Sequence, residues 1–218
     1  MNSSLLRAGS IALLLIATAV GAAPTTARAA GAGRWALAIH GGAGVIERAA
    51  LSPGKEAEYR AGLAAALAAG SGVLRAGGSS LDAVEATIRV LEDNPLFNAG
   101  RGAVFTAEGR NELDASIMDG RTRMAGAVTG VTRTKNPISL ARAVMERSPH
   151  VMLAGEGADA FSRERGLEQV DPAYFATEER WKQLEEWRRE HSSAIDLRHS
   201  YGTVGAVALD AGGHLAAG

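Results

Sequence analysis

The pattern of apolar and polar positions in the first hundred residues predicts an α/β protein. An apolar run at 35–39 stops at a glycine loop, which is typical of a short buried strand. Ser52-Pro53 is a start signal for an Ala- and Leu-rich helix that continues to position 76. A second helix begins with the capping residues 79–82, places its apolar residues on one face and ends at Asn94-Pro95.

The middle of the chain predicts short strands followed by more helices. Three strands separated by glycine-containing connections are expected at 104–106, 112–118 and 125–131. Three further helices are expected at 136–147, 155–165 and 178–190. The last of them is highly charged and is expected to dock through Trp181, Leu184 and Trp187.

The final stretch predicts a hairpin. Residues 201–210 are apolar and strand-like, 211–213 form a glycine turn, and 214–218 begin the return strand. So short a return would leave a long apolar edge unpaired. We therefore expect the sequence to be unfinished at Gly218, as a truncated gene product or an incomplete sequence.

Residues 1–29 have the layout of a secretory signal peptide. Arg7 supplies a positive charge, 11–20 is an apolar run, and Ala27-Arg28-Ala29 fits the small-x-small cleavage rule. The apolar run is too short to span a bilayer comfortably, so a membrane anchor is the weaker alternative. We expect removal after Ala29, no membrane association afterwards, and a periplasmic or secreted protein.

Composition narrows the function classes. Hydrophobic residues make up 46 % and charged residues 22 % of the 218 residues, with a net charge of −1, which is ordinary for a globular domain. Basic clusters with interleaved aromatic residues are absent from the sequence, so nucleic-acid binding is not expected. The sequence has no cysteine, and no histidine pair has metal-ligand spacing. A disulfide, a thiol nucleophile and a transition-metal site are therefore not expected.

Thr203 is a candidate nucleophile. A threonine hydroxyl is weak unless a base removes its proton, and a threonine at a chain N-terminus can use its own α-amine, whose pKa is about 7.7–8.0. This requires a cut between Gly202 and Thr203, made when the hydroxyl attacks the preceding carbonyl. Glycine at 202 permits the close approach. From Gly-Thr alone, an ordinary strand threonine is the alternative.

Two loops carry further candidate chemistry. The backbone N–H groups of 40–44 could hold an anion or an oxyanion, and His40 is either a structural histidine or a base. The helix end at 92–98 exposes carbonyl oxygens suited to a hard cation, although simple helix capping explains it as well. Asp114 and Asp119 are five apart on a strand and point to opposite faces, so we do not expect a carboxylate pair.

Several segments together resemble one family. The segments 39–44, 94–100, 112–120, 125–128, 148–152 and 202–208 occur in the order found in isoaspartyl peptidases and plant-type L-asparaginases, which are N-terminal-nucleophile hydrolases. The likeness covers nearly all of 35–218. It implies an α/β fold, the αββα four-layer sandwich, which would be incomplete in this chain. Residues 30–202 match the α-subunit part and 203–218 the start of the β-subunit.

The resemblance also implies roles for single residues. Thr203 matches the nucleophile, Gly202 and Thr203 flank the autocatalytic cut, and Asn98 matches a residue close to the active centre. The glycine loop matches a segment that supports maturation, with His40, Gly41, Gly42 and Gly44. In some members main-chain carbonyls hold a structural sodium ion, and the matching positions here are Leu91, Glu92, Asn94, Phe97, Ala99 and Arg101. The family often differs at Asn94 and has a smaller residue at Arg101.

The implied activity is hydrolysis of L-asparagine and of β-aspartyl dipeptides by an (αβ)₂ assembly, without a required cofactor. The substrate-clamping Arg and Asp and a Thr-Gly oxyanion segment of the family would fall beyond Gly218, so this chain by itself is expected to be inactive. Two alternatives stay open: a glycosylasparaginase-type hydrolase, which shares the fold and nucleophile, and an inactive exported fragment.

Overall fold

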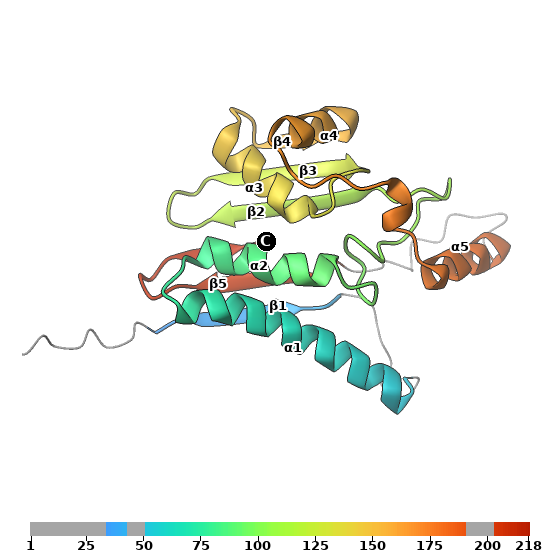
Figure 1. Cartoon of the computed structure of the whole chain (residues 1–218), viewed down its shortest axis with the longest axis horizontal. Coiled ribbons are helices and arrows are strands. Elements are labelled where there is room, and N and C mark those ends of the chain that lie inside the picture. Colours follow the sequence, from blue (N-terminus) through green and yellow to red (C-terminus); the bar gives the residue numbers. More distant parts are fainter. Residues whose placement is uncertain (1–33, 43–50, 191–202) are drawn as a thin grey trace, which may run out of the picture. The chain divides into compact units, whose positions relative to one another are not determined.

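The computed structural model describes residues 34–42, 51–190 and 203–218, which form one α/β unit. A mixed six-stranded sheet has the strand order β1-β5-β6-β2-β3-β4 (Figure 1). The strands are β1 (Ala36–His40), β2 (Leu113–Asp119), β3 (Ala125–Val131), β4 (Met152–Ala154), β5 (Gly205–Leu209) and β6 (Leu215–Ala217). The helices are α1 (Pro53–Arg75), α2 (Ser80–Glu92), α3 (Pro137–Arg147), α4 (Gly155–Glu164) and α5 (Glu178–Glu190), with a 3-10 turn at Pro172–Tyr174. All strand pairs are antiparallel except β3 with β4.

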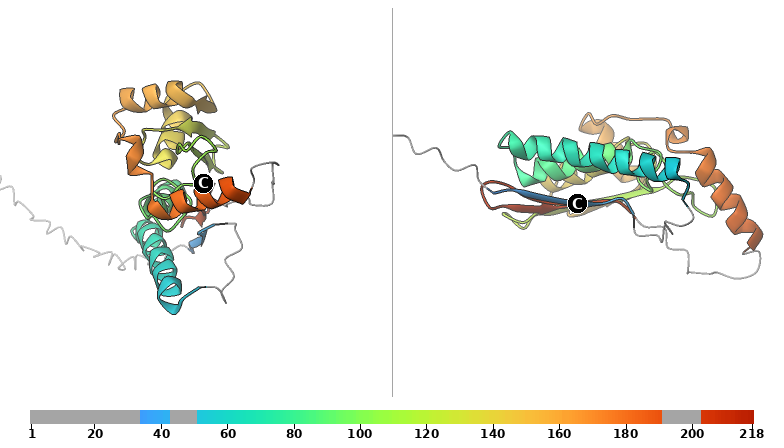
Figure 2. Two further views of the ribbon diagram at one scale, coloured as in Figure 1. Left: turned by 90° about the vertical axis from the view of Figure 1, so that its right-hand side faces the viewer. Right: turned by 90° about the horizontal axis from the view of Figure 1, so that it is seen from below.

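Helices cover one face of the sheet (Figure 2). Ile117 and Val128 point to that face and are buried, as are Ala206 and Ala216. Their neighbours along the strands point the other way, because side chains alternate across a sheet. Four large apolar side chains on that other face are exposed: Met118, Met152, Val207 and Leu215. The described residues therefore supply one helical layer and one sheet layer of the predicted sandwich.

The predicted helix starts are confirmed. The Ser52 hydroxyl accepts the Lys55 N–H at 3.2 Å ahead of α1, and the Ser79 hydroxyl accepts the Asp82 N–H at 3.1 Å ahead of α2. Both bonds satisfy a donor that the first helical turn leaves free. Although α1 is long, none of the helices in the described segments is apolar enough over a sufficient length to cross a membrane.

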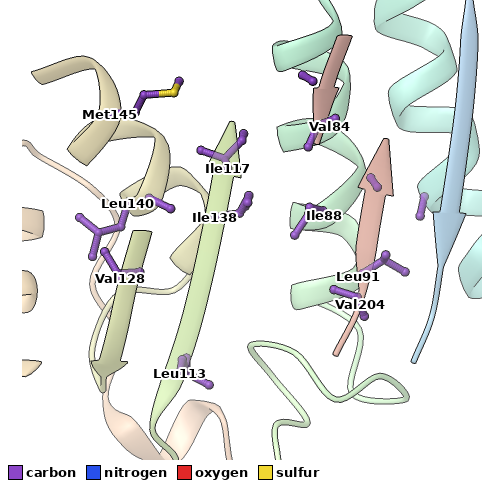
Figure 3. Packing of buried hydrophobic residues seen from close by; sticks show 14 of the residues in the cluster. Val84, Ile88, Leu91, Leu113, Ile117, Val128, Ile138, Leu140, Met145 and Val204 are labelled. Carbon is purple, nitrogen blue, oxygen red and sulfur yellow. The ribbon is translucent and has the colours of Figure 1, made fainter. Parts of the chain in front are cut away.

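The apolar core lies between the helical layer and the sheet, and Figure 3 shows its two parts. Side chains of α3 pack on β2 and β3, while Val84, Ile88 and Leu91 of α2 pack towards β5 and β6. Helices α1 and α2 approach closely where a small residue faces a larger one. A side-chain carbon at Gly70 would overlap the Thr87 hydroxyl, so glycine is required there.

Two predictions about strands are wrong. Residues 104–106 are not a strand, because the Val104 N–H is bound by the Asn98 side chain and the Thr106 N–H closes a turn onto the Arg110 carbonyl. Segment β5 is not a bare edge, because β1 pairs with its whole length from Gly205 to Leu209 and β6 pairs on its other side. The short strand β4 was not predicted.

Candidate active site

A pocket of about 780 Å³ opens at one end of the sheet. Strand β5 is antiparallel to β6, and β6 is antiparallel to β2, so β5 and β2 both begin at this end. For the same reason β1 and β3 both end there. The topology thus brings together polar residues that are far apart in sequence: His40, Asn98, Glu112, Asp114, Ser116, Thr129 and Thr203.

The pocket lies in a gap within the sheet. Gly218 pairs with Ala206 of β5 through two backbone hydrogen bonds of 3.0 Å, and β6 reaches β2 only at Met118 and Asp119. Nearer the pocket, no described segment lies between the start of β5 and the start of β2 (Figure 1).

Thr203 lies two residues before β5 and is exposed. It lines the pocket together with Val204 and Gly205. Thr203 is therefore accessible to a ligand in the pocket. Gly202, on the other side of the predicted cut, lies outside the described residues.

His40 is the last residue of β1 and is paired in register with Gly205. A side-chain carbon at Gly205 would overlap the imidazole Nε2, so the ring lies directly over this glycine. The ring also lines the pocket. His40 therefore lies two residues before the position that would face Thr203 if the pairing of β1 and β5 continued. Glycine at 205 leaves room for the imidazole ring.

The glycine loop packs on the loop that follows α2. A side-chain carbon at Gly41 would lie 2.7 Å from Cε1 of Phe97, so the absence of a side chain lets the Phe97 ring approach. Gly42 continues the loop and is exposed, whereas Gly44 lies outside the described residues. The glycine loop, which the resemblance links to the predicted cut, is therefore in contact with the loop that the resemblance links to a sodium ion.

Asn98 is held by the loop that follows it. Its Oδ1 accepts the Val104 N–H at 2.9 Å, which sets the rotation of the amide group. Asn111, which is buried, donates from Nδ2 to the carbonyls of Ala103 and Val104 at 2.9 and 3.2 Å. Asn98, Ala103 and Val104 all line the pocket.

Sequence reasoning missed Asp114 as a pocket residue. Its Oδ1 accepts the Thr129 hydroxyl at 2.7 Å and the Gly130 N–H at 2.9 Å, beside an irregular register in β2. Asp119 lies at the other end of β2, in its turn with β3, so the expectation that the two do not pair is confirmed. Only the knowledge that β2 and β5 begin at the same end could have identified Asp114.

Glu92 lies beneath the pocket and is 3 % exposed. Its Oε1 accepts the Ile138 N–H at 2.9 Å and so caps α3, while Oε2 meets no donor at hydrogen-bond geometry among the described residues, with the Asn136 side chain nearby. Burial raises the pKa of this carboxyl to about 8, because the charged form is poorly solvated there. Near neutral pH the group is therefore mainly protonated, which lowers the cost of leaving Oε2 unpaired.

The predicted sodium loop is tightly wound. The Glu92 carbonyl accepts the Arg101 N–H at 2.7 Å, and the Asn94 carbonyl accepts the Phe97 N–H at 3.2 Å. The Arg101 guanidinium lies 5.6 Å from the centroid of the Tyr174 ring. Across the described segments, no cluster of three or more His, Asp or Glu side chains could hold a metal ion. Any cation here would depend on carbonyl oxygens.

The mixed sheet with helices on one face is consistent with an N-terminal-nucleophile hydrolase domain. The sequence model of the asparaginase family matches residues 33–218, and the chain belongs to this family of hydrolases.

Curated relatives agree with this assignment. The chain is 51 % identical over 192 residues to an isoaspartyl peptidase of Escherichia coli (strain K12), a match that covers 85 % of this chain and 60 % of the relative. It is 43 % identical over 194 residues to an isoaspartyl peptidase/L-asparaginase of Rattus norvegicus, covering 88 % and 57 %. It is 46 % identical over 189 residues to a plant-type L-asparaginase of Pyrococcus furiosus, covering 80 % and 59 %. The chain thus spans about 60 % of the length of these relatives.

Proposed function

We propose that this chain, when extended by the second-subunit residues that the family places beyond Gly218, is an amidohydrolase that cuts itself before Thr203 and then hydrolyses β-aspartyl peptides and L-asparagine with Thr203 as nucleophile. This extended form is called the gene-encoded protein below. The observation that carries the proposal is the position of Thr203, exposed two residues before β5 in the pocket of an asparaginase-family chain. The names of the relatives, isoaspartyl peptidase and L-asparaginase, support the substrate class.

In the proposed reaction Thr203 supplies both the nucleophile, its hydroxyl, and the base, its α-amine. In the precursor the Thr203 hydroxyl attacks the Gly202 carbonyl, its proton passes to the leaving amide nitrogen, and water hydrolyses the resulting ester. The freed α-amine then serves as the base that takes the hydroxyl proton when Thr203 attacks the substrate carbonyl. Ammonia or an amino acid leaves with that proton, and water hydrolyses the acyl-enzyme to release aspartate.

The test is expression of the gene-encoded protein with Thr203 varied. Thr203→Ala should give one uncut band on a denaturing gel and no ammonia release from asparagine. Thr203→Ser retains a hydroxyl and should still cut, at a lower rate. If Thr203→Ala splits at the same bond, an external protease or another nucleophile makes the cut and the proposal is wrong.

Activity on a β-aspartyl dipeptide, compared with a glycosylated asparagine, tests the substrate class. Preference for the dipeptide is expected, because the relatives described above carry the isoaspartyl peptidase and L-asparaginase names. Preference for the glycosylated asparagine would establish the glycosylasparaginase type instead. A protein that is cut but hydrolyses neither would overturn the substrate assignment and leave the cut in place.

A sodium ion bound by main-chain carbonyls of the loop from Leu91 to Arg101 is a second part of the proposal. The donors are neutral oxygens, which suit a monovalent cation. Such an ion would hold the loop that carries Asn98. Replacing sodium by a bulky organic cation should then lower the melting temperature, and an unchanged melting temperature would exclude the ion.

Two further parts concern the whole protein. We expect export with loss of residues 1–29, so that N-terminal sequencing of the exported protein begins at Ala30, and an intact Met1 in the cytosol would contradict this. The family resemblance also predicts an (αβ)₂ assembly. Light scattering of the cut protein should give a mass of two α and two β chains, and a mass of one of each would refute it.

A further inference from the structure

The segment around the start of α5 holds the outer side of a loop that lines the pocket. The Gly102 N–H donates to the carbonyl of Phe175 at 3.0 Å, and Phe175 is fully buried. Arg180 Nε donates to the Gly102 carbonyl at 2.8 Å. Both polar groups of Gly102 are therefore bound by one distant segment.

Gly102 is the tight point of this loop. Its φ is +106°, and a side-chain carbon there would lie 2.5 Å from the Pro95 carbonyl oxygen. Only glycine adopts this conformation without strain. Because glycine has a wide range of backbone conformations, the orientation of its carbonyl depends on hydrogen bonds such as the one from Arg180.

A short covalent path leads from Gly102 to the pocket. The Gly102 carbonyl belongs to the peptide bond with Ala103, and the next peptide N–H is that of Val104. This N–H donates to Asn98 Oδ1 at 2.9 Å, and Ala103, Val104 and Asn98 line the pocket that contains Thr203. A rotation of the Gly102–Ala103 peptide would move the Val104 N–H and with it the Asn98 amide.

The other contacts of α5 act farther from the pocket. Arg188 Nη2 donates to the carbonyl of Ala107 at 2.5 Å, and the Trp181 ring meets the Phe105 ring edge-on with 5.2 Å between centroids. Neither Phe105 nor Ala107 lines the pocket. Arg180 differs because Nη1 also donates to Gln183 Oε1 at 2.8 Å, which fixes the plane of the guanidinium.

We propose that Arg180 is a positioning residue for the hydrolysis, acting through the Gly102 carbonyl and the Val104 N–H to set the orientation of Asn98 in the pocket. The inference rests on the proposed function for its kinetic consequences. The structural part of the inference, that Arg180 sets the orientation of Asn98, does not depend on hydrolytic activity.

Arg180→Met retains the length and the apolar stem of the side chain and removes the donor. Arg188→Met is the matched control, because it removes a similar bond from the same helix at the loop tip. Both are made in the gene-encoded protein, and a denaturing gel measures the cut fraction so that rates are expressed per cut chain. We expect Arg180→Met to lower kcat on a β-aspartyl dipeptide about tenfold with KM changed less than about threefold. Arg188→Met should stay within about twofold on both.

A double-mutant cycle distinguishes positioning from general support. In an Asn98→Ala background, Arg180→Met should cost less than about twofold more, because its target is already absent. Losses that multiply would overturn the proposal. Arg180→Lys, which can still donate to Gly102, should restore part of the activity, and a Lys variant no better than Met would show that the donor is not what matters.

An NMR measurement decides the geometric part even if the wild-type protein hydrolyses neither substrate. The side-chain amide signals of Asn98 are identified by their loss in Asn98→Ala. They should shift in Arg180→Met and keep their position in Arg188→Met. If the Asn98 side-chain amide signals do not shift in Arg180→Met, or shift equally in both variants, the link between Arg180 and Asn98 is refuted. Absence of turnover from the cut wild type would instead refute the proposed function.

Discussion

Asp210 connects the β5–β6 hairpin to the start of α2, and its removal is the sharpest test of the fold. Its Oδ1 accepts the Gly212 and His214 N–H groups at 2.9 and 3.0 Å, and its Oδ2 accepts the Ser80 N–H at 3.1 Å. Asp210 is 5 % exposed and Ser80 is 2 % exposed. The Ser80 donor is one of those that the first turn of a helix leaves free, and the helix dipole also favours a negative charge here.

The magnitude follows from these three donors. In Asp210→Ala the buried Ser80 N–H loses its partner, which costs about 1–3 kcal/mol, and the two turn donors lose about 0.5–1.5 kcal/mol each. The free energy of unfolding should therefore fall by about 2–6 kcal/mol. Asp210→Asn turns its amide NH₂ group towards one of the donors and should lose about 1–3 kcal/mol. The control is Asp119→Asn in the β2–β3 turn, whose Oδ1 accepts the Arg121 N–H and whose Oδ2 accepts the Thr122 hydroxyl, both from exposed residues. The new amide group should cost one of these two bonds, about 0.5–1.5 kcal/mol.

The effect should depend on pH in a defined direction. Burial opposes ionisation of Asp210, but the backbone donors of His214 and Ser80 and the nearby His214 side chain outweigh it and hold the pKa below its ordinary value of 3.8. A depressed pKa stabilises the fold above the unfolded-state value, and this stability is lost as pH falls through the folded-state value. Wild type and Asp210→Asn should thus differ fully at pH 6 and converge below pH 3.8.

The assay is urea unfolding of the gene-encoded protein followed by circular dichroism at several pH values. A loss in Asp210→Ala no larger than in Asp119→Asn would refute the assignment of Asp210 as the link between hairpin and helix. If the difference in free energy of unfolding between wild type and Asp210→Asn stays constant from pH 6 to pH 3, the contribution of the Asp210 charge is refuted. The hydrogen bonds of Asp210 would then remain as the explanation for the stability loss.

Two glycine substitutions test close approaches by the same unfolding assay and by the denaturing gel. Gly205→Ala should slow the cut before Thr203 and lower activity, because the new methyl group overlaps the His40 ring. Gly54→Ala is the control, because a methyl group there meets nothing within 4 Å. Equal behaviour of the two variants would contradict the placement of the His40 ring. Gly126→Ala should destabilise by at least about 2 kcal/mol, because its methyl would overlap the Ala141 carbonyl and lie 2.6 Å from the Met145 backbone nitrogen of α3. Gly157→Ala lies near the start of α4, where a methyl group meets nothing within 4 Å, and should stabilise the protein by about 0.4–1 kcal/mol. A destabilised Gly157→Ala together with an unaffected Gly126→Ala would refute both expectations.

Local sequence signals determined most of the elements. The serine caps before α1 and α2, the Asn-Pro pairs that end α2 and begin α3, and the glycine turn of the last hairpin each act over a few residues. Periodicity is also local, so the apolar face of α2 and the docking of α5 through Leu184 were predictable. The ordered set of family segments was sufficient to indicate the family to which the chain belongs.

Only the tertiary structure decided which strands are neighbours and where the polar residues meet. Nothing near β1 in the sequence states that it pairs with β5, because register depends on long-range packing. The same pairing places His40 over Gly205, and the strand directions bring Asp114 and Thr129 to the end of the sheet where Thr203 lies. Segment 104–106 has strand-like composition, yet the Asn98 and Asn111 side chains bind the backbone of Val104, so the segment forms a loop of which Val104 lines the pocket. The hold of Arg180 on Gly102 likewise depends on a contact between two distant loops, which no local pattern encodes.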